Sequence, residues 1–594
     1  MHTDSRSLMD RPFLGLPVEL LQYLFEFVRH QDLPACCQVS KLFHTLAAPV
    51  LYRRLWLRDQ IRLKKVFTVL GTRPHLAALL RVVEIRVFPF GLAAEALEAL
   101  EISIIRTFQA AVNLEELIWT RTGSFLPRTG FQRSRNDRVL RTIFDRIKRL
   151  RLLELTGDSR SWSPDLLIAK MPANIERLSL VMPDRTVSDR LPMIAERIGS
   201  ELHSLSILSN NATFIRDAYL EASAPFLENL TRLSLVGCKN ITGTVVAAVL
   251  KRCESKMTEL SLEGLNLMPE EVDLLCKLTP KLRTLAITHP SRSIPAAPFY
   301  ESLSRWIEQS HQLTRFTLYR MSGDVAAPDE EQLQQDDNDE QETEQTEQTP
   351  PPAPIVPTTA VQEPAMEVQS QENETSAPPA NEARASDSQA PEGGEALLPF
   401  SSLHINSPHL QRYRPTASEP GSRINPFAGM TLGQPSDPLL SSLLIKKLVQ
   451  SRGDQLVQLR IHRLAMSLDQ LGLICDGCPR LEDLVVHLFE PDIDLIRSHL
   501  SRLGHLRSVH ILASLRCGLE MTERDLLTIA QSCAGTLRQI GFRNRVWEVV
   551  ANVGLEAKSE ATTAPPDVSK RSVSLRRWDA SQGNWPEAFL VVRV

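Results

Sequence analysis

The sequence lacks long hydrophobic runs. No stretch of about eighteen consecutive apolar residues occurs in the 594-residue chain, so the sequence predicts no transmembrane helix. Its first ten residues are polar and charged and contain no apolar core of a secretory signal. We therefore expect a cytoplasmic or nuclear protein without a membrane partner, in which the nine cysteines are reduced thiols.

Aromatic residues, net charge and catalytic motifs are also scarce. Phe, Trp and Tyr make up 6% of the chain, and a formal net charge of −4 gives no general reason to expect a nucleic-acid partner. There is no Gly-rich phosphate loop, no GxSxG and no HExxH. One CxxC, Cys475 to Cys478, has no second ligand pair at a fitting distance, so we interpret it as two buried thiols. These absences favour a non-catalytic binding protein without cofactor or metal.

What the chain has instead is leucine at a regular period. The unit is an apolar residue, two others, a second apolar residue, one other and a third apolar residue. From Leu150 onward the unit starts are separated by 25, 27, 28, 27, 25 and 31 residues, and after a long gap by 25, 25 and 31. Such units each supply a strand and a helix, and they must stack because none can bury its apolar face alone. The units start at Leu114, Leu150, Ile175, Leu202, Leu230, Met257, Leu282, Leu313, Leu456, Leu481, Leu506 and Leu537, with a degenerate earlier unit at Leu80.

An acidic segment rich in Pro and Gln interrupts this array. Residues 324–438 have no apolar period and cannot offset their ordering entropy by burial, so we predict that they are disordered. Because the repeat resumes in phase, the insertion should leave from one unit of a single solenoid, whose two parts are residues 75–323 and 439–554. A linker, residues 555–571, then leads to a C-terminal piece, residues 572–594, which we expect to cap the last repeat.

The segment before the repeats, residues 12–57, has the apolar spacing of helices. An apolar stripe opens at Leu16, Pro49 is expected to end the third helix, and Leu55 and Trp56 extend the apolar set onto the next one. Three short helices cannot bury all of these side chains among themselves. The surplus either packs on the following domain or forms a docking face for a partner.

Several separated short motifs follow one another in this segment: Leu16-Pro17-Val18-Glu19-Leu20-Leu21, Asp32-Leu33, Val39-Ser40-Lys41-Leu42-Phe43, Leu46 and Pro49-Val50-Leu51-Tyr52. In their order and spacing, these motifs resemble an F-box. The unit at Leu230, with Cys238 and Cys253, resembles the cysteine-containing leucine-rich repeats often found downstream of F-boxes. The expected fold class is therefore α/β: a leucine-rich-repeat solenoid, or horseshoe, preceded by a small all-α F-box-like segment and interrupted by the disordered insertion.

The resemblance also implies a function and partners. It implies a substrate-recognition adaptor of an SCF-type (cullin–RING) ubiquitin ligase, which serves ubiquitin-dependent protein degradation without being an enzyme itself. Its partners would be the Skp-type linker, the cullin–RING core and a target protein. The residues that match the motif, and so would dock to the linker, are Leu16, Pro17, Glu19, Leu20, Leu24, Leu33, Val39, Phe43 and Leu46.

The register of the repeat predicts a surface for the target protein. In each unit the third, fifth and seventh positions face the concave side of the sheet. In the later units this surface is basic and contains histidines, and we expect His462 and His487 about 5 Å apart on adjacent strands. We predict that an acidic or phosphorylated target segment binds there, the alternative being an unselected polar surface. The predicted contact residues are Arg315, Tyr319, Arg460, His462, His487, His510 and Arg543.

Basic residues also crowd residues 121–151, where only Asp137 and Asp145 oppose them. Because no aromatic residues are interleaved, we interpret the run as a solvated face in preference to an anion-binding patch. Two further hypotheses remain: a scaffold outside any ligase whose F-box-like helices only cap the solenoid, and, less favoured, a nucleic-acid-associated protein. The basic residues are Arg121, Arg128, Arg133, Arg135, Arg138, Arg141, Arg146, Lys148, Arg149 and Arg151.

Overall fold

The structure is a computed structural model, and it describes residues 16–30, 32–87, 94–120, 131–157, 159, 162–209, 215–253, 255–291, 294–320, 440–489, 492–513, 520–533, 535–552 and 572–577. The chain divides into two compact units, one of Met1–Asp324 with Asn425–Val594 and one of Val325–Ile424. All described residues belong to the first unit. The predicted insertion, the predicted linker and residues 578–594 of the predicted cap lie outside the described residues.

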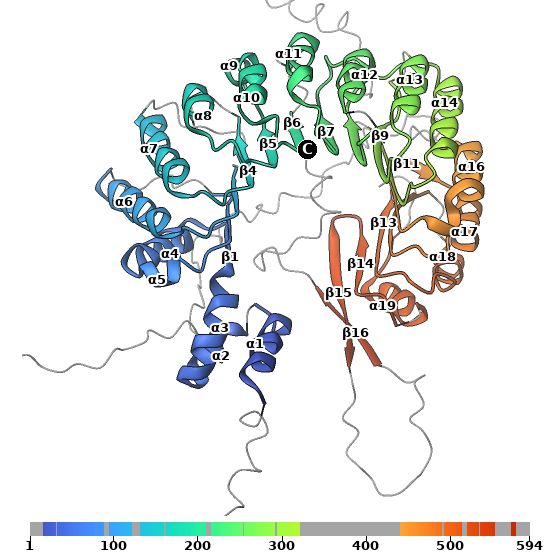
Figure 1. Cartoon of the computed structure of the whole chain (residues 1–594). Coiled ribbons are helices and arrows are strands. Elements are labelled where there is room, and N and C mark those ends of the chain that lie inside the picture. The colour runs from blue at the N-terminus through green and yellow to red at the C-terminus, as the bar shows by residue number, and fades with distance from the viewer. Residues whose placement is uncertain are drawn as a thin grey trace, which may run out of the picture. The chain divides into compact units, whose positions relative to one another are not determined.

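The described chain begins with three helices, α1 (Val18–Phe27), α2 (Leu33–Val39) and α3 (Lys41–Arg53) (Figure 1). The hydroxyl of Ser40 accepts a hydrogen bond from the Phe43 backbone N–H and so caps α3. The helices have a small core of their own, separate from that of the repeats, which consists of Leu21, Phe25, Leu33, Leu46 and Ala47.

Two expectations for this segment were wrong. Helix α3 does not end at Pro49 but continues through it to Arg53. A proline costs the helix one backbone hydrogen bond, and here the residues on both sides of it are packed into the core, which keeps the helix intact. Leu55 and Trp56 lie on a strand, β1 (Arg54–Leu57), not on a helix. The sheet therefore begins earlier than the predicted solenoid start at residue 75.

Within the described part of the chain, sixteen strands form one sheet in which each strand lies beside its neighbour in chain order. Strands β1 to β14 are parallel, and β14, β15 and β16 pair antiparallel. The strands are β1 (Arg54–Leu57), β2 (Val82–Ile85), β3 (Glu116–Trp119), β4 (Leu152–Thr156), β5 (Arg177–Val181), β6 (Ser204–Leu208), β7 (Arg232–Val236), β8 (Glu259–Glu263), β9 (Thr284–Thr288), β10 (Arg315–Tyr319), β11 (Gln458–Met466), β12 (Asp483–Leu488), β13 (Ser508–Ala513), β14 (Gln539–Phe542), β15 (Arg545–Asn552) and β16 (Ser572–Arg577).

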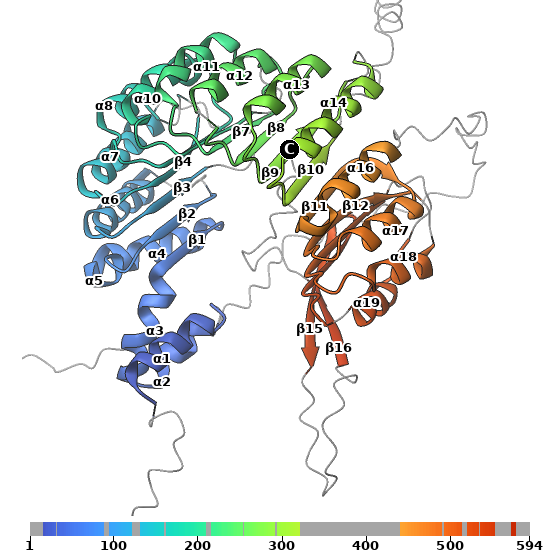
Figure 2. The same cartoon turned by 45° about the vertical axis from the view of Figure 1, so that its right-hand side comes forward.

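Helices lie between the successive parallel strands β1 to β14 and cover one face of the sheet (Figures 1 and 2). They are α4 (Gln60–Thr72), α5 (Pro74–Ala77), α6 (Ala94–Ala110), α7 (Phe131–Arg146), α8 (Pro164–Lys170), α9 (Arg185–Asp189), α10 (Leu191–Ile198), α11 (Asp217–Ser223), η1 (Ala224–Phe226), α12 (Gly243–Arg252), α13 (Pro269–Leu278), α14 (Ala296–Gln309), α16 (Ser442–Arg452), η2 (Gly453–Gln455), α17 (Leu468–Gly477), α18 (Ile493–Leu500) and α19 (Glu523–Ser532).

The predicted repeat units are confirmed. Each of the twelve units provides one strand from β3 to β14, and the degenerate unit at Leu80 provides β2. The unit with β7 shows why the pattern works: Leu230, Leu233 and Leu235 are buried between sheet and helices, while Ser234 lies on the other face. Each buried leucine contributes about 1.5–3 kcal/mol relative to an exposed one. The solenoid fold follows from this repeated gain.

An asparagine supports several of the turns that lead back into the sheet, a feature the pattern analysis missed. It directly precedes the first apolar residue of its unit, and its Nδ2 donates to a carbonyl oxygen of the preceding unit. Asn113 bonds Ala78 at 2.9 Å, Asn174 bonds Lys148 at 3.0 Å, and Asn229 bonds Ser200 at 2.8 Å. These amides satisfy carbonyl groups that the change of direction leaves without a helical or sheet partner.

The array continues directly across the site of the insertion. Strand β10, which precedes the insertion, pairs in parallel with β11, which follows it, so that Arg315 lies opposite Gln458 and Tyr319 opposite His462. The prediction that the repeat resumes in phase within one solenoid is therefore confirmed. The insertion itself, residues 324–438, is not described.

Candidate functional site

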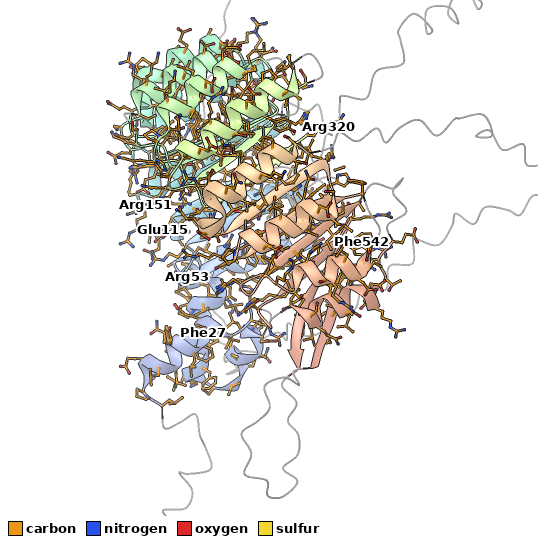
Figure 3. All side chains as sticks on the ribbon, turned by 90° about the vertical axis from the view of Figure 1, so that its right-hand side faces the viewer. Phe27, Arg53, Glu115, Arg151, Arg320 and Phe542 are labelled. Carbon is orange, nitrogen blue, oxygen red and sulfur yellow. The ribbon has the colours of Figure 1, made fainter. Side chains whose placement is uncertain are left out.

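Helix α1 has two apolar faces. Leu21 and Phe25 point into the core of the three helices. A second set, the outer stripe of α1, recurs at the same helical spacing about a third of a turn away and is exposed. Phe27, labelled in Figure 3, is 69% exposed. Its ring lies edge-on against that of Tyr23, with 4.9 Å between the ring centroids. The outer stripe consists of Leu20, Tyr23, Leu24 and Phe27.

The junction of α2 and α3 exposes further apolar side chains. Val39, the last residue of α2, is 65% exposed, and Leu42 in the first turn of α3 is 38% exposed. Large apolar side chains are common on surfaces as single residues, but several on one small helical segment mark an interaction site. The three helices therefore cover only one part of their apolar surface by themselves.

The structure divides the nine predicted docking residues into two groups. Pro17, Glu19, Leu20, Leu24 and Val39 are exposed, as direct contact with a partner requires. The others contribute to the core of the helical segment, and the helices already cover them: Leu33 and Leu46 are buried, and Leu16 and Phe43 are partly buried.

Four exposed apolar residues, Val18, Tyr23, Phe27 and Leu42, are missing from the docking residues that the F-box motif predicted. Tyr23 and Phe27 are three and seven residues beyond Leu20, which is the spacing of a single helix face, and Leu42 follows the cap of α3. Counting helical positions from Leu20 would have found Tyr23 and Phe27. Which of the two faces of α1 turns inward is decided only by packing against α3.

The uncovered face of the solenoid sheet carries a row of hydroxyl groups. Ser179, Ser206, Ser234 and Ser261 occupy the same register on β5, β6, β7 and β8 and pair directly from one strand to the next. All four are partly buried. Because their side chains are small, this part of the face presents hydroxyls close to the backbone.

Further along the same face, arginine side chains accumulate on β10 and β11. Arg315 is exposed, whereas Arg460 forms an ion pair with Asp483 at 2.6 Å and its side chain is only 13% exposed. The guanidinium of Arg463 lies 5.7 Å from the ring centroid of Tyr319. Arg543 is partly buried. Of the predicted target-contacting arginines, Arg315 is thus the most accessible.

The three histidines predicted to form an open surface are buried. His462 is 1% exposed, His510 4% and His487 8%. The expected pairing of His462 with His487 is wrong, because β11 bulges between Arg460 and Ala465, so that His487 lies opposite Ala465. The bulge contains Arg463, whose φ of 58° is left-handed. His462 instead lies opposite Tyr319, with 5.9 Å between the ring centroids.

Burial also lowers the pKa of two of these histidines, His462 and His510. Desolvation, reinforced by the nearby Arg460 guanidinium, lowers the pKa of His462 to about 3. Desolvation likewise lowers the pKa of His510, against the opposing effect of a hydrogen bond between its Nε2 and the Arg543 carbonyl oxygen at 2.6 Å. His462 is therefore neutral at physiological pH and adds no positive charge to this face, whereas the arginines remain charged.

The CxxC cysteines are buried thiols, as interpreted. Cys475 and Cys478 lie at the end of α17, and burial raises the pKa of each to about 12, so both stay protonated. The other cysteines near unit starts, Cys253, Cys276 and Cys533, are also buried near helix ends. Among the described residues, no three His, Cys, Asp or Glu side chains are arranged to hold a metal ion. Nor does the described part contain a helix of the length and apolar character needed to cross a membrane.

Comparison with known proteins assigns the first segment. Residues 13–58, which span α1, α2, α3 and β1, match the F-box-like family. The chain thus contains an F-box-like domain, which precedes a solenoid of the leucine-rich-repeat type. A search of curated proteins gave no match.

Several solved structures show low similarity to this chain. The leucine-rich repeat-containing protein LegL7 from Legionella pneumophila is 17% identical with a TM-score of 0.31, and the match covers 46% of this chain and 85% of that one. The Rad7 and Elc1 complex in yeast is 11% identical with a TM-score of 0.38, and the match covers 88% of this chain and 96% of that one. An internalin from Listeria monocytogenes is 13% identical with a TM-score of 0.25, and the match covers 52% of this chain and 87% of that one. Because these TM-scores lie below 0.5, the solenoid assignment rests on the strand order and repeat geometry described above.

Proposed function

We propose that this chain is the substrate-recognition adaptor of an SCF-type ubiquitin ligase. Its F-box-like helices dock to a Skp-type linker, and the uncovered sheet face of the solenoid binds the target protein. The observation that carries the proposal is the outer stripe of α1, an apolar face that the described residues leave exposed, on a segment that matches the F-box-like family. On this proposal the chain performs no covalent chemistry and acts by bringing the target close to the conjugating enzyme.

The energetics of the outer stripe favour a protein partner. Full burial of a leucine or phenylalanine side chain contributes about 1.5–3 kcal/mol. Association itself costs at least about 4 kcal/mol, so a partner must cover several of these residues at once. Clustered aromatic and aliphatic side chains of this kind are typical of the residues that dominate binding energy at interfaces. Tyr23 and Phe27 already contact each other and offer such a cluster.

Docking is tested with Leu20→Asp combined with Phe27→Asp in the full chain. Both side chains are exposed, so the variant should fold, whereas a change at Phe43 would disturb its ring contact with Phe25 at 5.3 Å. We expect co-purification with the linker to weaken by about a hundredfold or more. The matched control, Gln22→Asp with Gln38→Asp, adds the same charge at exposed polar positions and should leave binding unchanged.

Unchanged linker binding by the folded Leu20→Asp, Phe27→Asp variant would refute the docking proposal. The alternative hypothesis, that the helices only cap the solenoid, predicts no linker binding at all and a less stable solenoid when residues 1–53 are deleted. The separate core of the helical segment argues against a mere cap. Contacts between the segment and the sheet do exist, such as that between the rings of His30 and Trp56, whose centroids are 6.0 Å apart.

Target binding is tested by site-specific photo-cross-linking. A cross-linking amino acid at Ser234 places the probe on the uncovered sheet face, and one at Lys251 places it on exposed α12 on the opposite face. We expect ubiquitylated proteins to be captured from Ser234 and not from Lys251. Charge reversal by Arg315→Glu should weaken capture of an acidic target, because Arg315 is exposed on this face. Equal capture from both positions would contradict the assignment of the binding face.

A further inference from the structure

The turn between α7 and β4 borders a surface hollow of about 470 Å³. It lies at the edge of the sheet where the chain returns from the helices to β3, β4 and β5. Glu115 and Arg151, each directly before a strand, meet there through a hydrogen bond of 2.8 Å from the Arg151 N–H to the Glu115 carbonyl oxygen (Figure 3). The hollow is lined by Glu115, Lys148, Arg149, Arg151 and Asn174.

Positive charge exceeds negative charge in this hollow. The Glu115 carboxylate is already paired with Arg81, at 2.8 Å, and Arg151 is paired with Glu176, at 3.4 Å. Lys148 and Arg149 form no ion pair with a carboxylate in the described part of the chain. Two cations of adjacent residues thus remain without a counter-charge, and both are exposed to an incoming ligand.

Comparison with another unit of the same solenoid shows that Lys148 is the unusual residue of the two. Lys256 precedes its unit as Arg149 does, and each donates to the amide oxygen of an asparagine in an earlier unit: Lys256 to Asn229 and Arg149 to Asn113, both at 3.2 Å. That contact is part of the repeat architecture. Lys148 has no such partner among the described residues, and it adds a second cation beside the first.

The backbone that carries the two cations is held in place. The Asn174 side chain donates from Nδ2 to the Lys148 carbonyl oxygen at 3.0 Å and to the Leu150 carbonyl oxygen at 3.3 Å. The turn is therefore fixed from the next unit before any ligand arrives. A preorganised turn reduces the entropy lost on binding, so that only the Lys148 and Arg149 side chains have to be ordered.

We infer that this hollow binds a phosphate monoester carried by a protein segment. A phosphate monoester carries close to two negative charges, which match the two uncompensated cations in number. Its three strong acceptor oxygens can accept hydrogen bonds from both cations at once. A single carboxylate would leave one cation uncompensated. The hollow is larger than a phosphate group, which leaves room for the side chain that bears it. This site is distinct from the sheet face and does not depend on linker docking.

The test is a titration of the full chain at low salt with three probes. These are a short phosphoserine peptide with glycine and alanine flanks, the same peptide without phosphate, and inorganic phosphate. We expect saturable binding of the phosphopeptide that weakens as salt is raised, and no binding of the unphosphorylated peptide. Lys148→Ala with Arg149→Ala should weaken phosphopeptide binding by about tenfold or more.

Two variants control for charge and for folding. Arg141→Ala with Arg146→Ala removes the same charge from exposed positions of α7 that do not line the hollow, and should change binding by less than about twofold. Lys148→Arg with Arg149→Lys keeps both charges and should retain binding. Circular dichroism and thermal unfolding confirm that each variant is folded.

Several results would overturn the inference. Absence of phosphopeptide binding at low salt would show that Lys148 and Arg149 only stabilise the C-terminal end of α7, where the helix dipole is negative. If phosphopeptide binding fell equally in both double-alanine variants, the effect would come from the net charge of the chain and not from this hollow. Binding of inorganic phosphate that is as tight as that of the phosphopeptide would contradict a protein segment as the source.

Discussion

Arg452 joins the two parts of the solenoid that the insertion separates in sequence. It is the last residue of α16, is 7% exposed, and contacts the end of α14 and the turn that follows, 141 to 145 residues earlier in the chain. Its Nε donates to the Ile307 carbonyl oxygen at 2.9 Å, and Nη2 bonds the Glu308 carbonyl oxygen and His311 Nδ1. We predict that Arg452→Met, which keeps much of the apolar stem, destabilises the part after the insertion.

The size of the effect follows from the contacts that are lost. Hydrogen bonds from a charged donor contribute about 1.5–3 kcal/mol each, and the two carbonyls lie at the C-terminal end of a helix, where a cation is favoured. Burial lowers the pKa of Arg452, which shows that desolvation opposes part of this gain. We therefore expect a net loss of about 2–4 kcal/mol in local stability. Lys447→Met is the control on the same helix: its pair with Glu308, at 2.8 Å, is exposed on both sides and contributes less than about 1 kcal/mol.

Hydrogen exchange measured by mass spectrometry resolves this effect, because repeat arrays open locally and not only as a whole. Amides of α16 and β11 should exchange about 30- to 1000-fold faster in Arg452→Met, since about 1.4 kcal/mol corresponds to a factor of ten. Amides of β5 to β7, several units away, should be unaffected. Equal exchange of α16 and β11 in Arg452→Met and Lys447→Met would refute the role of Arg452 as a joint between the two parts.

Two further predictions concern buried polar side chains. Because the pKa of His462 is about 3 in the folded chain and near 6.5 when unfolded, the unfolded state binds more protons below pH 6.5, and stability should fall as pH decreases from there, by about 1.4 kcal/mol per pH unit. Urea unfolding of His462→Phe should show a shallower loss between pH 6.5 and 4, and an unchanged slope would contradict this. Thr279→Val removes the acceptor at 3.0 Å from the buried Trp306 Nε1 and should cost about 1–3 kcal/mol, whereas Thr279→Ser should cost clearly less in the same unfolding assay.

The sequence by itself predicted the solenoid because its cause is local and repeated. Three apolar positions in six residues, recurring every 25 to 31 residues from Leu150 to Leu313 and again from Leu456 to Leu537, specify a strand whose alternate side chains must be covered, and this pattern placed β3 to β14 correctly. The F-box-like segment was found in the same way, from separated short motifs that agree in spacing. The repeat period and the spaced motifs can be recognised without knowledge of contacts between distant parts of the chain.

Only the tertiary structure decided which side chains are available for binding. The bulge in β11 moved His487 away from His462, and burial made His462 neutral, although the repeat register alone predicted an open basic pair. Packing of α1 against α3 selected Leu21 and Phe25 for the core and left the outer stripe exposed. Burial, charge state and long-range hydrogen bonds depend on residues far away in sequence, so a pattern read along the chain predicts the architecture but not the accessible surface.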